Sequence, residues 1–214
     1  MKDKLRITEI FYSLQGETRT VGLPTVFVRL TGCPLRCQYC DSAYAFQGGQ
    51  LMTIDAVLAE VIAYQPRYVT VTGGEPLAQP LCYDLLSRLC DMNYVVSLET
   101  SGAIDISKVD SRVIKVVDIK TPGSLEMSRN IYENLQKLTP QDQVKFVICD
   151  EVDYIWSKDL MYQYKLDQRC EVLFSPSYQQ LDNKTLADWI IKDNLPVRFQ
   201  LQLHKYIWGD IPGV

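Results

Sequence analysis

The sequence predicts an α/β fold in which parallel strands alternate with helices to form a partial barrel of the (β/α)6 type. Short runs rich in β-branched and aromatic residues recur along the 214-residue chain, and helical patterns lie between most of them. The connections are short, as in parallel βαβ units whose helices cover the outer face of the sheet. About six units are present, fewer than the eight that close a complete barrel of roughly 250 residues. A doubly wound open sheet is the alternative.

The individual elements follow from the periodicity of apolar residues. Strands are predicted at residues 6–11, 26–30, 68–72, 94–99, 113–118, 144–148, 172–175 and 197–203. Helices are predicted at residues 53–64, 81–92, 128–138, 153–164 and 184–194. The clearest helix is the first, because Thr53 can cap its first turn and one apolar stripe follows, made of Ile54, Val57, Leu58, Val61 and Ile62.

Small and polar residues gather where the predicted strands end. In parallel α/β folds the carboxyl ends of the strands meet at one edge, and ligands bind there. We therefore expect one site fed by several loops, which carry Thr31, Gly32 and Cys33; Gly73, Gly74 and Glu75; Thr100, Ser101 and Gly102; Asp118, Ile119 and Lys120; and Ser175, Pro176 and Ser177.

The composition predicts one globular domain over residues 1–214. The hydrophobic fraction of 47% and the charged fraction of 22% are ordinary for such a protein, which argues against disorder, collagen and coiled coil. The first residues lack the apolar run of a secretory signal, and no stretch reaches the roughly 18 apolar residues that span a bilayer. We expect a cytoplasmic protein with no membrane partner.

Charge and cysteine content narrow the function further. The formal net charge is −4 and the basic residues are scattered, whereas proteins that bind nucleic acids usually show a basic patch. This pattern favours a small-molecule substrate over nucleic acid. Seven cysteines without an export signal indicate free or metal-bound thiols rather than disulfides.

Three of these cysteines form a candidate metal-binding loop. Cys33, Cys37 and Cys40 have C-x3-C-x2-C spacing after an apolar strand, and thiolates are the usual ligands of iron–sulfur clusters. Three ligands for four irons leave one iron open to a substrate or cofactor. A structural zinc site would need a fourth ligand, and none of the remaining candidates forms a second close pair: Cys82, Cys90, Cys149, Cys170 and the sole histidine, His204. We expect no functional role for those four cysteines.

Two motifs together resemble the radical S-adenosylmethionine superfamily. One is the cysteine spacing with Tyr39 just before Cys40, and the other is Gly-Gly-Glu-Pro at residues 73–76 after a strand. The resemblance implies a [4Fe–4S] cluster whose open iron binds S-adenosylmethionine, and an external one-electron reductant such as flavodoxin. One electron then cleaves the sulfonium to a 5′-deoxyadenosyl radical. The glycines permit a close backbone approach, and Glu75 can accept from the methionyl ammonium.

A wider resemblance, over nearly the whole chain, is to the 7-carboxy-7-deazaguanine synthase family of queuosine biosynthesis. It is carried by YSLQGE at residues 12–17, FVRL at 27–30, CDS at 40–42, Thr72, and QLHK at 202–205. The family converts 6-carboxy-5,6,7,8-tetrahydropterin to 7-carboxy-7-deazaguanine with loss of ammonia. The resemblance implies this carbon–nitrogen lyase activity, use of Mg²⁺ and a homodimer.

The resemblance also assigns residues to the substrate. Arg29 would pair with the substrate carboxylate, and without the resemblance it would equally be a salt-bridged strand residue. Thr72 would touch the substrate, and His204 and Val214 belong to a tail that closes over the pterin. The pterin edge alternates donors and acceptors, and its expected partners are Leu14, Gln15, Gly16 and Glu17.

Cofactor contacts are implied at several strand ends, and no side chain is assigned as catalytic. Ser42 falls where the family places a hydroxyl ligand of Mg²⁺, beside the cluster ligands Cys33, Cys37 and Cys40. The sequence departs from the family's Ser-Pro-Lys at Asp118-Ile119-Lys120, where an internal ion pair is the alternative, and from Gln-Pro at Ser175-Pro176. The residues assigned to S-adenosylmethionine are Tyr39, Cys40, Asp41, Gly74, Glu75, Asp118, Ile119, Lys120, Ser175 and Pro176.

Two other functions stay open at this point. A radical activase, which makes a glycyl radical on a partner enzyme, has a similar size and the same cysteine spacing, although residues 14–17 and Arg29 suit a small polar heterocycle better. A non-catalytic iron–sulfur carrier or a zinc-binding module would belong to a different class. Carriers generally saturate their irons with protein ligands, which this spacing does not provide.

Overall fold

The computed structural model describes residues 3–213, and its strands form one nine-stranded sheet in the order β3-β1-β2-β4-β5-β6-β7-β8-β9. From β2 to β9, neighbouring strands are parallel, whereas β1 is antiparallel to both β2 and β3. The strands are β1 (Leu5–Leu14), β2 (Pro24–Leu30), β3 (Gln50–Met52), β4 (Tyr68–Gly73), β5 (Val95–Thr100), β6 (Ile114–Asp118), β7 (Gln143–Ile148), β8 (Glu171–Pro176) and β9 (Arg198–Phe199).

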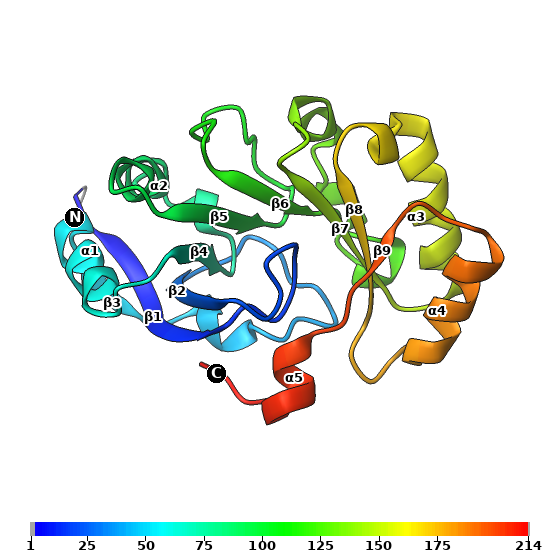
Figure 1. Cartoon of the computed structure of the whole chain (residues 1–214), viewed down its shortest axis with the longest axis horizontal. Coiled ribbons are helices and arrows are strands. Elements are labelled where there is room, and N and C mark those ends of the chain that lie inside the picture. The colour runs from blue at the N-terminus through cyan, green and yellow to red at the C-terminus, as the bar shows by residue number, and fades with distance from the viewer. Residues whose placement is uncertain (1–2, 214) are drawn as a thin grey trace.

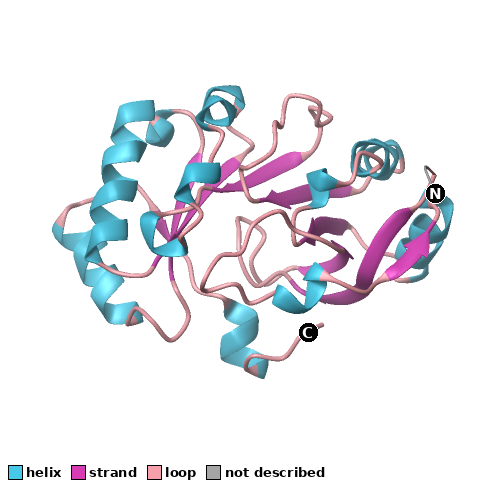
Figure 2. Cartoon of the chain, turned by 180° about the vertical axis from the view of Figure 1, so that it is seen from behind, coloured by secondary structure: helices cyan, strands magenta, loops and turns pink. Residues whose placement is uncertain are grey.

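The order of the strands confirms the partial barrel over the doubly wound sheet. A doubly wound sheet reverses its strand order at a switch point, whereas here the parallel strands follow the chain without reversal. Because crossovers between parallel strands are right-handed, all the connecting helices then lie on one face. Figures 1 and 2 show these helices outside a curved sheet that does not close on itself.

Four predicted helices are confirmed with small shifts of their ends, namely α1 (Ile54–Ala63), α2 (Cys82–Asp91), α3 (Glu151–Tyr164) and α4 (Asn183–Lys192). Thr53 caps α1 as predicted, because its side-chain oxygen accepts from the backbone N–H of Ala56 at 3.2 Å. The apolar stripe of α1 is narrower than predicted, since Ile62 is 48% exposed.

The segment at 128–138 is not the predicted α-helix. It consists of two short 3₁₀ segments, Met127–Arg129 and Tyr132–Lys137. The buried Asn134 side chain donates to the carbonyls of Gly102 and Ile104, at 3.2 and 2.9 Å. These bonds hold the segment in tight turns against the loop after β5, so tertiary contacts override its helical pattern.

The predicted strand at 197–203 is also wrong beyond its first residues. Only Arg198–Phe199 pairs with β8, and a helix that the sequence did not predict, α5 (Leu203–Trp208), begins where the strand was expected to end. The chain leaves the sheet because the Leu203 N–H donates to the Gly16 carbonyl at 2.9 Å, on the far side of the barrel. The three-residue β3 and the antiparallel pairing of β1 were not predicted either.

The loop that joins β1 to β2, residues 15–23, crosses the concave side of the sheet (Figure 1). Gln15 and Thr18 are almost fully buried in it. The Arg19 N–H donates to the Gln143 side chain at 3.2 Å, and the Arg19 guanidinium pairs with Glu171 at 3.2 Å. The loop therefore joins the first strands to the starts of β7 and β8, across a barrel that the sheet leaves open.

None of the helices in the described part of the chain has the length and apolar character needed to span a bilayer.

Candidate active site

A cavity of about 320 Å³ opens at the carboxyl ends of the strands, where the sequence places its candidate residues. Its lining residues come from β1 and the loop after it, the cysteine loop, six parallel strands (β2, β4, β5, β6, β7 and β8) and the C-terminal segment. The predicted residues that line it are Leu14, Gln15, Gly16, Glu17, Arg29, Cys33, Cys37, Tyr39, Cys40, Asp41, Ser42, Thr72, Gly73, Gly74, Thr100, Ser101, Asp118, Lys120, Ser175, Pro176, Ser177 and His204. Val214 lies outside the described residues.

The cysteine loop leaves β2 through a glycine and presents three thiols to the cavity. Gly32 has a φ of 98°, a conformation that favours glycine, and its N–H donates to the Ala45 carbonyl at 2.8 Å. The buried Leu35 anchors the middle of the loop. The Cys40 N–H donates to the Cys37 carbonyl at 3.2 Å, which closes a turn between the last two thiols.

The donor set fits a cluster better than a single metal ion. A tetrahedral zinc site needs four ligands about 2.0 to 2.3 Å from one point. Within the described residues, no three histidine, cysteine, aspartate or glutamate side chains converge in that way. Iron–sulfur clusters instead bind each thiolate to a different iron, so their ligands are farther apart. Three thiols that line one cavity from one loop match that requirement.

Burial favours the neutral form of two of these thiols in the absence of metal. It raises the pKa of Cys33, and it raises the pKa of Cys37 to about 11. The Lys120 ammonium opposes both shifts. Because only thiolates bind iron, loading of the site must release protons, and Lys120 is placed to favour that step.

The second predicted motif packs directly on the cysteine loop. A Cβ on Gly74 would lie 2.6 Å from Cys33 Cβ and 2.8 Å from the Gly32 carbonyl carbon, closer than real Cβ atoms come. The next residue, Glu75, donates its N–H to the Gly32 carbonyl at 2.9 Å. Only glycine allows this approach, so the two motifs form one unit at the ends of β2 and β4.

The Glu75 side chain does not have its predicted place. It is fully buried and does not line the cavity. Its carboxylate accepts from the Thr100 hydroxyl at 2.9 Å and from the Ser101 N–H at 2.7 Å. These bonds satisfy the buried charge and hold the loop after β5 against the Gly-Gly-Glu-Pro turn. The structure therefore gives no support for a contact between the Glu75 carboxylate and the methionyl ammonium.

Two of the three residues predicted at the end of β6, Asp118 and Lys120, line the cavity. Lys120 Nζ pairs with Asp118 Oδ1 at 3.1 Å, which confirms the internal ion pair that was the alternative at this strand end. Although burial disfavours the ammonium form, Asp118 holds the pKa of Lys120 above its usual range. The Ile119 side chain is fully buried in the core and does not line the cavity. Its N–H donates to the Lys145 carbonyl at 2.9 Å, so the structure gives no support for the predicted cofactor contact at this residue.

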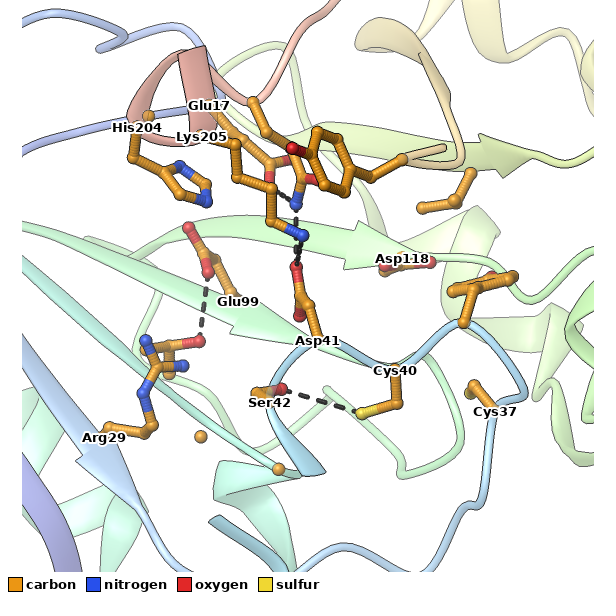
Figure 3. Close-up of a pocket in the computed structure, with 18 of the residues that line it drawn as sticks. Glu17, Arg29, Cys37, Cys40, Asp41, Ser42, Glu99, Asp118, His204 and Lys205 are labelled. Atoms are coloured by element: carbon orange, nitrogen blue, oxygen red, sulfur yellow. Dashed lines mark hydrogen bonds and ion pairs between the residues drawn. The ribbon is translucent and has the colours of Figure 1, made fainter. Parts of the chain in front are cut away.

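Arg29 faces the other end of the cavity (Figure 3) and is also salt-bridged. Its Nε lies 2.6 Å from Glu9 Oε1, and the Tyr44 hydroxyl donates to the same oxygen at 2.7 Å. The guanidinium carbon lies 5.9 Å from the centroid of Phe11. These contacts orient the guanidinium, and the hydrogen bonds among the described residues use only its Nε.

Glu99, which the sequence analysis did not single out, lies beside this end. Its carboxylate accepts from the Thr72 hydroxyl at 3.0 Å and from Gln15 Nε2 at 3.3 Å. Burial raises the pKa of Glu99, and the nearby Glu17 charge adds to the shift. A carboxylate held by two donors inside a cavity can accept further donors from a ligand.

Glu17 is paired with a second residue that was missed, Lys145 on β7. Although burial opposes ionisation, Lys145 holds the pKa of Glu17 below its usual value. Gln202 also donates to Glu17 Oε1 at 3.1 Å. Glu17 therefore enters the cavity as part of a neutralised pair and not as a free carboxylate.

The C-terminal segment closes one side of the cavity. His204 packs on Gly16, where a Cβ would lie 2.9 Å from the imidazole Cγ, so residue 16 must be glycine for the ring to sit there. Lys205 Nζ lies 3.2 Å from Asp41 Oδ2. Burial opposes the ionisation of Asp41, but Lys205 keeps its pKa low, at about 2. Ser42 also lines the cavity, with its hydroxyl 3.8 Å from Cys40 Sγ.

One signal could have found the missed residues. Glu99 and Lys145 are charged residues within runs of apolar strand residues, VVSLE and VKFVI. In a parallel sheet buried on both faces such a charge needs a partner or a ligand. Lys205 had no comparable signal, because its position depends on how the C-terminal segment returns across the barrel.

Comparisons with known proteins agree on one family. The Radical SAM superfamily profile matches residues 27–144. The chain is 45% identical to 7-carboxy-7-deazaguanine synthase of Chlorobaculum tepidum, over 98% of this chain and 97% of that protein. It is 42% identical to the enzyme of the same name from Koribacter versatilis, over 95% and 97% of the two chains. The crystal structure of QueE from Escherichia coli superposes with a TM-score of 0.77 at 21% identity, covering 93% of this chain and 94% of that one.

Proposed function

Because the chain belongs to the 7-carboxy-7-deazaguanine synthase family of radical S-adenosylmethionine enzymes, we propose that it converts 6-carboxy-5,6,7,8-tetrahydropterin to 7-carboxy-7-deazaguanine with loss of ammonia. The observation that carries the proposal is a cavity with two chemically different ends. Figure 3 shows Cys37 and Cys40 toward one side and Arg29, Glu99 and His204 toward the other. A cluster with its cofactor suits the first end, and a polar heterocycle with a carboxylate suits the second.

The thiol end holds the cofactors of the family, a [4Fe–4S] cluster and S-adenosylmethionine. When bound, they supply a 5′-deoxyadenosyl radical that takes a hydrogen atom from the substrate. Cys33, Cys37 and Cys40 would bind three irons, and Gly74, which lines the same cavity, would lie beside the methionyl group. Tyr39 has a buried hydroxyl without a hydrogen-bond partner among the described residues, and it faces the same cavity. A ligand that enters beside Cys40 would satisfy it.

The charged end binds the substrate. The outer guanidinium nitrogens of Arg29 pair with the substrate carboxylate, while Glu9 holds Nε and fixes the plane of the group. The pterin ring presents N–H donors on its pyrimidine edge, and the Glu99 carboxylate is placed to accept them. The Gln15 amide is almost fully buried and already bonded to Thr70 and Glu99. The Gln15 N–H and carbonyl are also bonded, to Leu23 and Gly22. Residues 14–16 therefore shape the wall of the cavity beside Thr72.

We assign Mg²⁺ to the region of Ser42, between the two ends. Magnesium takes few protein ligands and keeps several waters. Within the part of the chain that the structure describes, the Ser42 hydroxyl has only a weak bond, to a thiol. It can therefore serve as one oxygen ligand, and the substrate and water would supply the others. The same proposal includes one domain over residues 1–214, a homodimer, an external reductant such as flavodoxin, and action in the cytoplasm.

The test is anaerobic turnover of the reconstituted enzyme with S-adenosylmethionine, a one-electron reductant and the carboxy-tetrahydropterin, with and without Mg²⁺. We expect a deazapurine ultraviolet spectrum without any partner protein, and a slower rate when Mg²⁺ is removed. Arg29→Ala should raise the KM for the pterin and leave the binding of S-adenosylmethionine intact. Cleavage of S-adenosylmethionine with no deazapurine would contradict the assignment of the substrate.

The relatives do not favour the radical activase. They are 7-carboxy-7-deazaguanine synthases over nearly their full length. The turnover assay separates the two functions directly, since an activase needs its partner enzyme. An electron carrier is separated by adding S-adenosylmethionine to the reconstituted cluster, because a saturated cluster would show no spectral change.

A further inference from the structure

Lys205 is a buried cation at which three parts of the chain meet. Its Nζ lies 3.2 Å from Asp41 Oδ2 in the cysteine loop and 3.4 Å from Asp210 Oδ1 in the C-terminal segment. It also lies 4.6 Å from the centroid of Tyr178, in the loop after β8. The side chain is only 7% exposed, so its charge is placed among these partners rather than in solvent. Figure 3 shows its pair with Asp41.

The neighbouring Gln202 strengthens the link between the C-terminal segment and the cysteine loop. Its Nε2 donates to Asp41 Oδ2 at 2.8 Å and to Glu17 Oε1 at 3.1 Å. Among the described residues, the Asp41 carboxylate has two polar partners: it accepts a hydrogen bond from Gln202 and forms an ion pair with Lys205. Asp41 therefore keeps its position only while the segment around α5 is docked.

Asp41 immediately follows Cys40, so this link acts next to a cluster ligand. The other side of Cys40 is held separately, since the side-chain amides of Gln38 and Gln180 exchange two hydrogen bonds at 3.1 and 3.0 Å. The turn that carries Cys40 is thus held at both ends by the last part of the barrel. The contact before Cys40 is neutral, between Gln38 and Gln180 in the loop after β8. The contact after Cys40 is ionic, between Asp41 and Lys205.

We propose that Lys205 is a positioning residue that couples docking of the C-terminal segment to the geometry of the turn at residues 40–42. When Lys205 pairs with Asp41, the third cluster ligand and the Ser42 hydroxyl take the positions that the reaction requires. When the C-terminal segment is not docked, the same turn loses its ion pair with Lys205. The inference rests on the proposed function in one respect, that residues 40–42 contact the cluster, cofactor and metal.

The test uses Lys205→Met, which keeps most of the unbranched apolar side chain and removes its charge, and Lys205→Arg, which restores the charge. Lys184→Met is the matched control, because Lys184 is 80% exposed and its one ion pair within residues 3–213 is with Asp188 on the outer helix α4. In the reconstituted holoenzyme we expect Lys205→Met to bind as much iron as the parent and to lose at least tenfold in kcat, with a smaller change in the KM for the pterin. Lys205→Arg should recover part of kcat, and Lys184→Met should match the parent.

A double-mutant cycle with Asp41→Asn isolates the pair. If the two side chains act through one contact, the double variant should be no slower than the slower single variant, because the second change removes nothing further. Rate losses that multiply, or a parent-like kcat for Lys205→Met, would overturn the proposal.

A readout on the unloaded chain separates this inference from the proposed function. We expect Lys205→Met to speed hydrogen–deuterium exchange at the amides of Cys40 and Ala45, whose bonds close the turn, by about tenfold relative to the parent and Lys184→Met. Unchanged exchange there would refute the coupling even if the enzyme is active. Faster exchange in a protein that makes no deazaguanine would instead overturn the proposed substrate and keep the coupling.

Discussion

Gly74→Ala tests whether the Gly-Gly-Glu-Pro turn packs against the cysteine loop as the structure has it. The added methyl group would lie 2.6 Å from Cys33 Cβ and 2.8 Å from the Gly32 carbonyl carbon. Both distances are shorter than 3.0 Å, below which Cβ contacts essentially never occur. Neither neighbour is the end of a flexible side chain. The two loops must therefore separate.

The cost follows from what that separation breaks. Overpacking of this kind costs about 1 to 3 kcal/mol. The displaced turn also strains the bonds from the Gly74 N–H to the Leu30 carbonyl and from the Glu75 N–H to the Gly32 carbonyl, 3.3 and 2.9 Å long, each worth about 1 kcal/mol. We expect a loss of about 3 to 5 kcal/mol in the free energy of unfolding, which corresponds to a fall in Tm of roughly 6 to 20 °C for a chain of this size.

The assay is thermal unfolding of the metal-free protein under reducing conditions, followed by circular dichroism. Gly48→Ala is the control, since a Cβ there would have no atom of residues 3–213 within 4 Å and adds only the strain of its φ of 80°, about 1 to 2 kcal/mol. Gly74→Ala should also bind less iron than the parent after reconstitution. If Gly74→Ala melts within about 2 °C of the parent, or no lower than Gly48→Ala, the close contact between the motifs is wrong.

Three further changes probe separate parts of the site. Arg29→Lys removes the guanidinium group that can bind Glu9 through Nε and a substrate carboxylate through its outer nitrogens. We therefore expect the KM for the pterin to rise at least tenfold, with little change in S-adenosylmethionine binding. An unchanged KM would refute the assignment of Arg29 to the substrate. Cys37→Ser should abolish most cluster binding, measured as iron and sulfide per chain, whereas Cys90→Ser, a buried cysteine of α2 outside the cavity, should keep it. Burial lowers the pKa of His204 in the folded chain, whereas the unfolded chain keeps the ordinary value of about 6.5. As the pH falls below about 6.5, the unfolded chain binds a proton more readily than the folded one, so the free energy of unfolding should decrease. As His204 is the sole histidine, its imidazole proton resonance reports this pKa directly, and a midpoint at or above 6.5 would contradict its packing on the loop.

The parts of the site that are local in sequence could be predicted. Cys33, Cys37 and Cys40 lie within eight residues, so their spacing alone indicates a shared metal centre. The Gly-Gly-Glu-Pro turn follows a strand directly, and the structure places both motifs at one edge because the strands before them, β2 and β4, are parallel neighbours. The alternation of strand and helix predicted the sheet for the same reason, since each unit is short and carries its own apolar pattern.

Local patterns failed where a distant contact decided the conformation. Residues 128–138 have a helical pattern, but the amide of Asn134 binds carbonyls about 30 residues earlier and holds the segment in 3₁₀ turns. Residues 197–203 have a strand pattern, but the Leu203 N–H binds Gly16 across the barrel and begins α5. Neither partner could be identified from the segment itself.

The role of each charged side chain was also decided by tertiary structure. Glu75 was expected to face a ligand, and it is buried with Thr100 and Ser101 because β4 and β5 are adjacent. Glu99 and Lys145 became cavity residues because the sheet curves and directs its concave face toward one volume. A buried charge must find its partner in space, and that partner is set by strand order and curvature.

The sequence by itself determined the strand–helix alternation, the three-thiol loop and the glycine turn, because each depends on residues close together in the chain. Only the tertiary structure decided that β1 runs antiparallel at the edge, that its loop crosses the barrel to β7 and β8, and that α5 returns to pair Lys205 with Asp41. The physical reason is the range of the interactions. Propensity and spacing act over a few residues, whereas the pairing of buried charges and the closure of an open barrel join residues more than 100 positions apart.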